Sequence, residues 1–172
     1  MQDVDSLFIE AGRAIDESDL VAAKSLLEEI LMIDPGYSRA HNYLGWIYET
    51  RLKNFEKAKR HYELAIKFSQ GDYPVVYVNY AYLLIEYDCY EDALTIIEDG
   101  MKIKGADRAT LIYQKGKVAE SLQEFTEAYR LYNYSRKLSF NKDFMNLIDM
   151  EIERLFAKLS FCQKIKVKVK GV

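Results

Sequence analysis

The sequence predicts an all-α fold: a right-handed α-solenoid (superhelix) of about four helix pairs, closed by a C-terminal capping helix. One observation is that a single pattern of small and large apolar residues returns every 35 residues. A repeat of about 20–50 residues is typical of solenoid proteins. A second observation is that each repeat holds two short stretches with apolar residues three and four apart, separated by polar residues. This spacing indicates two amphipathic helices joined by a turn.

Three sets of equally spaced positions carry the repeat. The first set is always alanine, the second is Leu or aromatic, and the third is large and apolar. They are Ala23, Ala58, Ala93 and Ala128; Leu20, Phe55, Tyr90 and Phe125; and Leu27, Tyr62, Ile97 and Tyr132. We expect alanine where two antiparallel helices approach to roughly 8–10 Å, because a larger side chain would hold them apart.

In these residues the chain resembles the tetratricopeptide repeat family, whose unit reads W-x2-L-G-x2-Y…A-x3-F…P. The clearest copy is His41-x2-Leu44-Gly45-x2-Tyr48 followed by Ala58-x3-Tyr62. Further copies are Tyr77-x2-Tyr80-Ala81-x2-Leu84 with Ala93-x3-Ile97, and Ile112-x2-Lys115-Gly116-x2-Ala119 with Ala128-x3-Tyr132. The resemblance implies four repeats over residues 1–140, at about 3–36, 38–71, 74–106 and 107–140.

Start and stop signals place the individual helices. We expect helices over 1–15, 20–33, 38–50, 54–68, from 74 onward, 90–104, 107–122 and 124–138. The predicted N-caps are Asp19, Ser38, Asn54 and Asp107, because short polar side chains accept hydrogen bonds from the first turn of a helix. Gly71 and Gly105 suit the left-handed backbone that ends many helices.

The C-terminal part lacks the repeat signature. Residues 141–162 form an amphipathic pattern whose apolar positions are Phe144, Ile148, Ile152, Leu155, Phe156 and Leu159. A helix that caps the open end of the array is one interpretation, and a homodimer through the 144–159 helix is the other. The basic tail, 163–172, alternates lysine with aliphatic residues at 164–170. This alternation indicates either a frayed end or an exposed strand that adds to a partner's sheet, with docking on an acidic surface as a further interpretation. No membrane partner is expected, because three aliphatic residues bury little area.

Composition excludes several classes of function. Five lysines and no acid follow Phe156, so the chain up to Phe156 holds 19 basic and 27 acidic residues. Such an acidic body argues against a nucleic-acid-binding surface. No apolar run is long enough for a membrane span, and no secretory signal is evident. Cys89 and Cys162 suit free thiols in a reducing compartment, so the expected location is cytoplasmic.

No catalytic, metal or cofactor site is expected, because His41 and His61 have no further ligand at a metal-binding spacing and no phosphate-binding loop is present. The resemblance instead implies a protein or peptide partner in a concave groove lined by the first helix of each repeat. The positions carried over are Asn42, Trp46, Glu49, Val78, Tyr82, Ile85, Tyr113, Lys117 and Glu120, with Phe8, Gly12 and Ile15 from the first repeat.

The lone tryptophan, Trp46, either faces this groove as an interface anchor or packs between helices. The function expected is a non-enzymatic interaction module, an adaptor, scaffold or assembly factor. The alternatives are a secretion-type chaperone that holds a client protein and a structural homo-oligomeric subunit.

Overall fold

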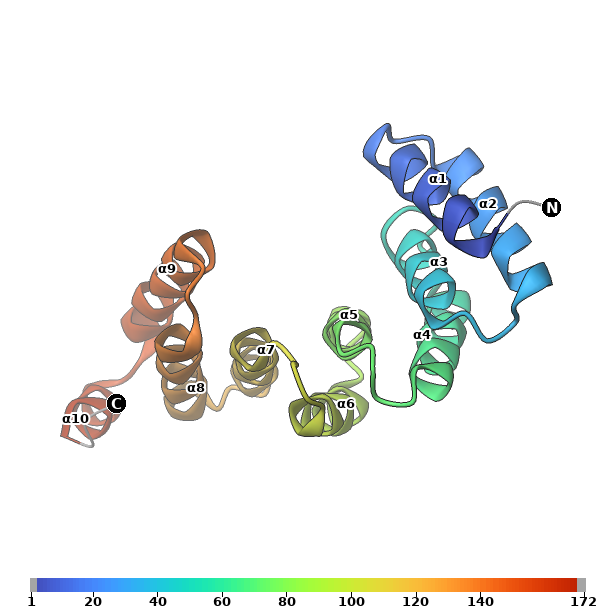
Figure 1. Ribbon diagram of the computed structural model, residues 1–172. Helices are drawn as coiled ribbons and strands as arrows, with labels where there is room; N and C mark the ends of the chain where they lie inside the picture. Colours follow the sequence, from blue (N-terminus) through green and yellow to red (C-terminus); the bar gives the residue numbers. More distant parts are fainter. Residues whose placement is uncertain (1–2, 170–172) are drawn as a thin grey trace. The chain divides into compact units, whose positions relative to one another are not determined.

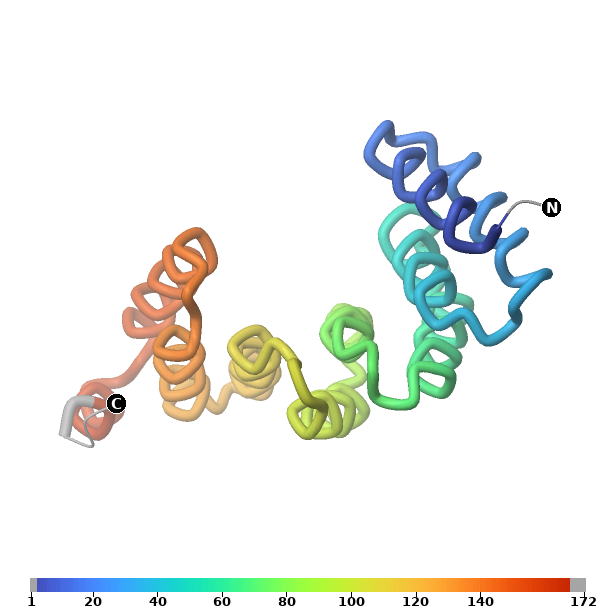
Figure 2. The backbone as a smooth tube through the Cα atoms, in the orientation of Figure 1, coloured from blue at the N-terminus to red at the C-terminus, as the bar shows by residue number. Residues whose placement is uncertain are grey.

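The computed structural model describes residues 3–169, and within that range every regular element is a helix (Figure 1). This confirms the all-α prediction. The helices are α1 (Val4–Asp16), α2 (Leu20–Ile33), α3 (Ser38–Thr50), α4 (Phe55–Ser69), α5 (Val75–Glu86), α6 (Tyr90–Lys102), α7 (Arg108–Ser121), α8 (Phe125–Leu138), α9 (Lys142–Lys158) and α10 (Phe161–Val169). The backbone trace shows α1–α2, α3–α4 and α7–α8 as antiparallel hairpins (Figure 2).

Side-chain caps begin four of these helices. The side chains of Asp19, Asn54, Asp107 and Asn141 each accept a hydrogen bond of 3.0–3.1 Å from a backbone N–H in the first turn. The prediction for Ser38 was wrong: Ser38 is the first residue of α3, and its N-cap, Tyr37, makes no side-chain cap. Tyr37 has a large aromatic side chain and not the short polar one that accepts a hydrogen bond from the first turn of a helix.

The turns inside the hairpins repeat as regularly as the alanines. Each contains one residue with positive φ, and these residues are Ser18, Lys53, Asp88 and Gln123. The turn of the second hairpin is one residue longer than the others and covers residues 51–54. A left-handed residue reverses the chain at the end of a helix and satisfies its last carbonyls. The 35-residue period therefore extends to the turns.

The basic tail differs from both sequence interpretations. Residues 161–169 form helix α10, where alternation of lysine and aliphatic residues predicted a frayed end or a strand. Val167 is buried and α10 packs on α8. The burial of Val167 is a tertiary interaction with a neighbouring helix, and an alternating sequence pattern does not predict such an interaction.

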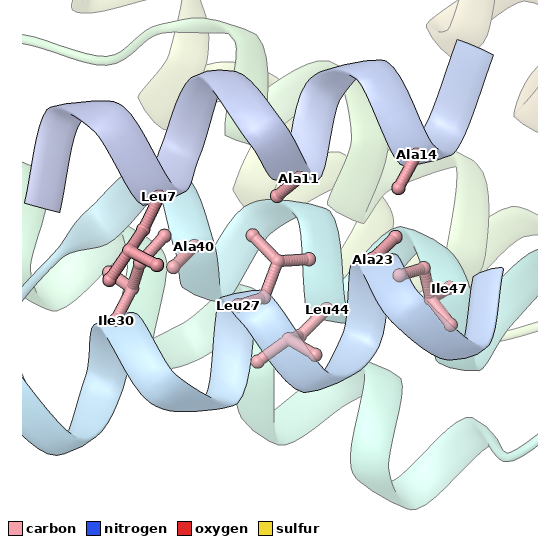
Figure 3. Close-up of a cluster of buried hydrophobic side chains, with 9 residues drawn as sticks. All are labelled: Leu7, Ala11, Ala14, Ala23, Leu27, Ile30, Ala40, Leu44 and Ile47. Carbon is pink, nitrogen blue, oxygen red and sulfur yellow. The ribbon is translucent and has the colours of Figure 1, made fainter. Parts of the chain in front are cut away.

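Two compact units make up the chain, residues 1–83 and residues 84–172. The core of the first unit joins α1, α2 and α3, and Figure 3 shows Leu7, Ala11 and Ala14 of α1 pointing toward this cluster. The core of the second unit contains Ile148 and Leu155 of α9 packed with residues of α7 and α8. The apolar stripe of α9 is therefore covered within its own chain, which favours the capping interpretation over the dimer.

The repeated positions lie where the spacing predicted. The four alanines Ala23, Ala58, Ala93 and Ala128, and the four large residues Leu27, Tyr62, Ile97 and Tyr132, all have no exposed surface. The second set, Leu20, Phe55, Tyr90 and Phe125, provides the first residue of α2, α4, α6 and α8. The second helix of each hairpin thus begins with a large apolar residue and carries a fully buried alanine three residues later.

Glycine allows the closest helix crossings. A Cβ atom at Gly45 would lie 2.8 Å from the ring of Tyr62, and a Cβ at Gly116 would lie 2.6 Å from the ring of Tyr132. Both distances are well below van der Waals contact. Each tyrosine ring therefore packs against the first helix of its hairpin, in the space that is open because glycine has no side chain.

We predict that Gly45→Ala lowers the free energy of unfolding by about 1–3 kcal/mol, because the added methyl group overpacks the contact with Tyr62. Gly12→Ala is the matched control: it is also helical, and its Cβ would meet no atom within 4 Å. That variant should be neutral or gain up to about 1 kcal/mol from helix propensity. Urea titrations of both variants provide the measurement, and equal losses would contradict the packing argument.

Candidate protein-interaction surface

The first helices of successive hairpins lie side by side in the first unit. The rings of Phe8 on α1 and Tyr43 on α3 are 5.5 Å apart, nearly perpendicular. The Asn79 side-chain amide on α5 donates a 3.0 Å hydrogen bond to Oδ1 of Asn42 on α3. The Asn42 amide in turn donates to the hydroxyl of Tyr73 at 3.3 Å. These contacts join α1, α3 and the part of α5 up to Leu83 into one face.

An aromatic band runs along this face. We use that name for five residues that are all half-buried: Phe8, Tyr37, Tyr43, Trp46 and Tyr73. Phe8 touches the rings of both Tyr37 and Tyr43. Burial raises the pKa of Tyr73 to about 12, with a smaller contribution from Tyr43. Half-buried aromatic rings of this kind present apolar area and polar tips to a binding partner.

The predicted site residues of this unit occupy three different environments. Asn42 is buried and its amide is used by Tyr73 and Asn79. Trp46 is half-buried and packs against the core of α1, α2 and α3, which is the packing role of the two that the sequence left open. Val78 is half-buried, and Tyr82 is 44% exposed. Tyr82 is thus the most accessible aromatic residue among the predicted positions.

Glu49 and Glu120 share a structural role that the sequence interpretation did not include. The hydroxyl of Tyr62 donates to Glu49 at 2.5 Å, and that of Tyr132 donates to Glu120 at 3.0 Å. Burial, followed by the adjacent carboxylate, raises the pKa of each of these tyrosines. Each glutamate thus satisfies the buried hydroxyl of its own hairpin.

A signal for this role is present in the sequence. The hairpins with a buried tyrosine carry Gly and Glu four residues apart on the first helix, at Gly45 and Glu49 and at Gly116 and Glu120. The other two hairpins have Leu27 or Ile97 in place of tyrosine. Their first helices carry Ala and Ile at the same two positions, which are Ala11 and Ile15, and Ala81 and Ile85. The residue four positions after the small residue is therefore Glu where the second helix carries a buried tyrosine, and Ile where the second helix carries Leu or Ile.

In the second unit the predicted positions contact α9. The Tyr113 hydroxyl donates to Glu151 at 3.3 Å, and the Lys117 ammonium lies 3.6 Å from the same carboxylate. Arg154 donates two 2.6 Å hydrogen bonds to Glu120, and Lys158 donates a third at 3.1 Å. These ionic contacts line a polar cleft of about 520 Å³ between α7 and α9. Ile85, the remaining predicted residue, is half-buried at the end of α5.

The charge of Glu120 is strongly favoured in this network. Burial by itself raises the pKa of Glu120, but hydrogen bonds from Arg154, Lys158 and Tyr132 outweigh it and lower the pKa to about 2. Glu120 is therefore ionised over the physiological range and ties α7 to α9. The side chain of Arg154 is 42% exposed, so water screens part of this attraction.

The two histidines, which the sequence interpretation treated separately, form a pair between α3 and α4. The Nδ1 atoms of His41 and His61 are 3.1 Å apart, and Nε2 of His41 is 3.1 Å from the carbonyl oxygen of Pro35. A carbonyl only accepts, so His41 carries its proton on Nε2 and accepts at Nδ1 from His61. Burial, followed by the neighbouring His41 and Arg60, lowers the pKa of His61 to about 4. Both rings are therefore neutral packing groups at pH 7.

The described part of the chain offers no cluster of three or more His, Cys, Asp or Glu side chains suited to a metal ion. Among the described helices, none has the length and apolar character needed to cross a bilayer. A candidate catalytic arrangement does not emerge from the residues brought together here.

Hairpins whose first helices share one face define this chain as an α-helical repeat protein. Comparison with solved structures shows that its fold is that of tetratricopeptide repeat proteins. Pseudomonas aeruginosa PilF matches with a TM-score of 0.80 at 21% identity, covering 90% of this chain and 68% of PilF. Yeast Tom70 matches with a TM-score of 0.77 at 16% identity, over 99% of this chain but 37% of Tom70.

A third structure is YrrB, described as a TPR protein with an unusual peptide-binding site, with a TM-score of 0.67 at 14% identity, over 91% of this chain and 77% of YrrB. Neither models of protein families nor curated proteins match the sequence itself. Identities this low establish the fold alone.

We predict that Glu120→Gln lowers the free energy of unfolding by about 1–2 kcal/mol at pH 7, because it weakens the charged hydrogen bonds to Arg154 and Lys158. The folded-state pKa of Glu120 is depressed to about 2. Its stabilisation is therefore present above the ordinary glutamate pKa of about 4.3 and is lost as pH falls toward 2. The difference from wild type should shrink over that window in urea titrations.

Glu153→Gln, at an exposed position on α9, is the control for loss of one negative charge and should leave stability within about 0.5 kcal/mol. A loss as large at Glu153 as at Glu120 would contradict the role of the α7–α9 network.

The histidine pair predicts a separate acid sensitivity. The pKa of His61 is depressed from 6.5 to about 4, so its neutral form stabilises the fold above pH 6.5 and this stabilisation is lost as pH falls to 4. The expected loss is at most about 3 kcal/mol. His61→Phe keeps a ring beside Tyr48 but does not titrate, so its stability should fall less steeply between those pH values. If the stability of wild type and of the variant fell with the same slope over this pH range, the role of His61 would be refuted.

Proposed function

We propose that this chain is a non-enzymatic protein-interaction module that binds a segment of a partner protein along the face formed by α1, α3 and α5. The observation that carries the proposal is the continuous aromatic band, bounded on α5 by the 44% exposed ring of Tyr82. Tyrosine and tryptophan are enriched at binding hot spots because they bury much area with little loss of conformational freedom.

The partner we propose is a peptide segment with apolar or aromatic side chains. The band supplies rings and phenol groups but few charges, so an apolar side chain gains more from this face than a charged one does. The description of YrrB as a peptide-binding TPR protein supports the same class of ligand. Free thiols at Cys89 and Cys162 support a reducing compartment such as the cytoplasm.

The nine predicted positions contribute to this proposal in different ways. Trp46, Val78 and Tyr82 are proposed to contact the partner directly. Asn42 and Glu49 are proposed to hold Tyr73 and Tyr62, and so to shape the face. Ile85, Tyr113, Lys117 and Glu120 belong to the second unit, where the last three contact α9.

Peptide display against the full chain, followed by affinity measurement with the selected peptides, tests the proposal. Tyr82→Ala should weaken binding about tenfold or more, as loss of a central aromatic contact does. Tyr134→Ala removes an equally exposed tyrosine from α8 and should leave affinity unchanged. Both variants should keep the wild-type circular dichroism spectrum. Failure to select any peptide, or equal effects of the two variants, would refute this binding face.

Trp46→Ala is a weaker test of binding alone, since Trp46 also packs against the core of α1, α2 and α3. It should reduce both affinity and stability, the latter by about 1–3 kcal/mol for a half-buried aromatic residue.

A further inference from the structure

Helix α10 presents an apolar surface that its own chain leaves uncovered. It holds to the second unit through Val167, which is buried, and through Lys164, whose ammonium lies 5.3 Å from the ring centre of Phe156. On its outer side, Phe161 is 78% exposed and Ile165 is 47% exposed. These two residues are four apart, so they occupy one side of the helix.

Lysines flank the exposed apolar side. At about 100° per residue, Lys164 lies about 80° to one side of the line between Phe161 and Ile165, and Lys166 lies about 120° to the other. Lysine side chains in such positions extend their ammonium groups away from an apolar contact while their methylene stems lie along it. The helix is thus amphipathic with basic margins.

Positive charge is concentrated in the same region of the sequence. All five charged residues after Phe156 are lysines, whereas the preceding part has 19 basic and 27 acidic residues. The α10 region is therefore a local basic patch on an acidic protein. Three of these lysines, Lys164, Lys166 and Lys168, belong to α10. A lysine close to an anionic lipid surface contributes about 1 kcal/mol of attraction.

We propose that α10 is a docking element for an anionic phospholipid surface. Phe161 and Ile165 would enter the boundary between headgroups and acyl chains, and the lysines would contact the phosphate and carboxylate groups above it. A lipid surface suits a convex helix better than a folded protein partner does, because it needs no complementary groove. This docking is peripheral and independent of the peptide-binding face proposed for the first unit.

Vesicle binding tests the proposal, with Cys162 as a built-in probe. Cys162 is exposed beside Phe161 and is free, as is Cys89. In the full chain carrying Cys89→Ser, an environment-sensitive fluorophore on Cys162 should shift to the blue with phosphatidylserine-containing vesicles and not with phosphatidylcholine vesicles. The shift should disappear as salt rises from about 0.05 M to about 0.5 M, because screening weakens the lysine contacts.

Two variants separate the contributions, with unlabelled protein and co-sedimentation as the readout. Lys166→Gln with Lys168→Gln should lower the partition coefficient about 25-fold, at about fivefold for each lysine, and leaves the contact of Lys164 with Phe156 in place. Phe161→Ser should lower it several-fold at every salt concentration. The matched control, Lys137→Gln with Lys142→Gln, removes two exposed lysines from the same unit and should have little effect.

Absence of binding to phosphatidylserine vesicles at low salt would overturn the proposal, as would equal losses in the α10 variant and the control variant. Light scattering in the absence of vesicles identifies the competing occupant. If the protein does not bind vesicles but self-associates with rising concentration, and Lys166→Gln with Lys168→Gln abolishes this association, α10 would be assigned to an acidic surface on another copy instead.

Discussion

Every hairpin in this chain depends on the close crossing of its two helices at one alanine. Ala23, Ala58, Ala93 and Ala128 have no exposed surface, and a larger side chain there would separate the helices. Two hairpins go further and place a tyrosine ring against a glycine, which leaves a buried hydroxyl that needs an acceptor. Glu49 and Glu120 accept from those hydroxyls. Where the small residue on the first helix is glycine, the large residue on the second helix is therefore a tyrosine, and a glutamate accepts a hydrogen bond from its hydroxyl.

This constraint explains how much the sequence revealed. The alanine period alone located the hairpins, because burial at a fixed spacing is a local property of two adjacent helices. The environments of Tyr113 and Lys117 could not be predicted, since they depend on α9, which carries no repeat signature. The contact of Phe8 with Tyr43 and the helical state of residues 161–169 also depend on tertiary neighbours. The position of a residue within the repeat predicted the face of the helix on which it lies, but not the residues that it contacts.

The two units use equivalent positions in different ways. In the first unit, the face made by α1, α3 and α5 carries half-buried aromatic rings and the exposed Tyr82. In the second, the face of α7 is engaged by Glu151, Arg154 and Lys158 of α9. A terminal helix that pairs ionically with the repeat before it satisfies the polar groups of that repeat, as the end of a repeat array requires. Half-buried aromatic rings and ionic contacts with α9 thus occur at equivalent positions in different units.

The left-handed residues in the turns have a practical consequence. Ser18, Lys53, Asp88 and Gln123 are all exposed, and the same left-handed backbone is formed by four different residue types, none of them glycine. The longer turn at residues 51–54 shows that this geometry accepts an additional residue without displacing the alanine crossing. Segments of foreign sequence, such as an epitope or a fluorescent reporter, could be grafted into that loop while the hairpin beneath it stays intact.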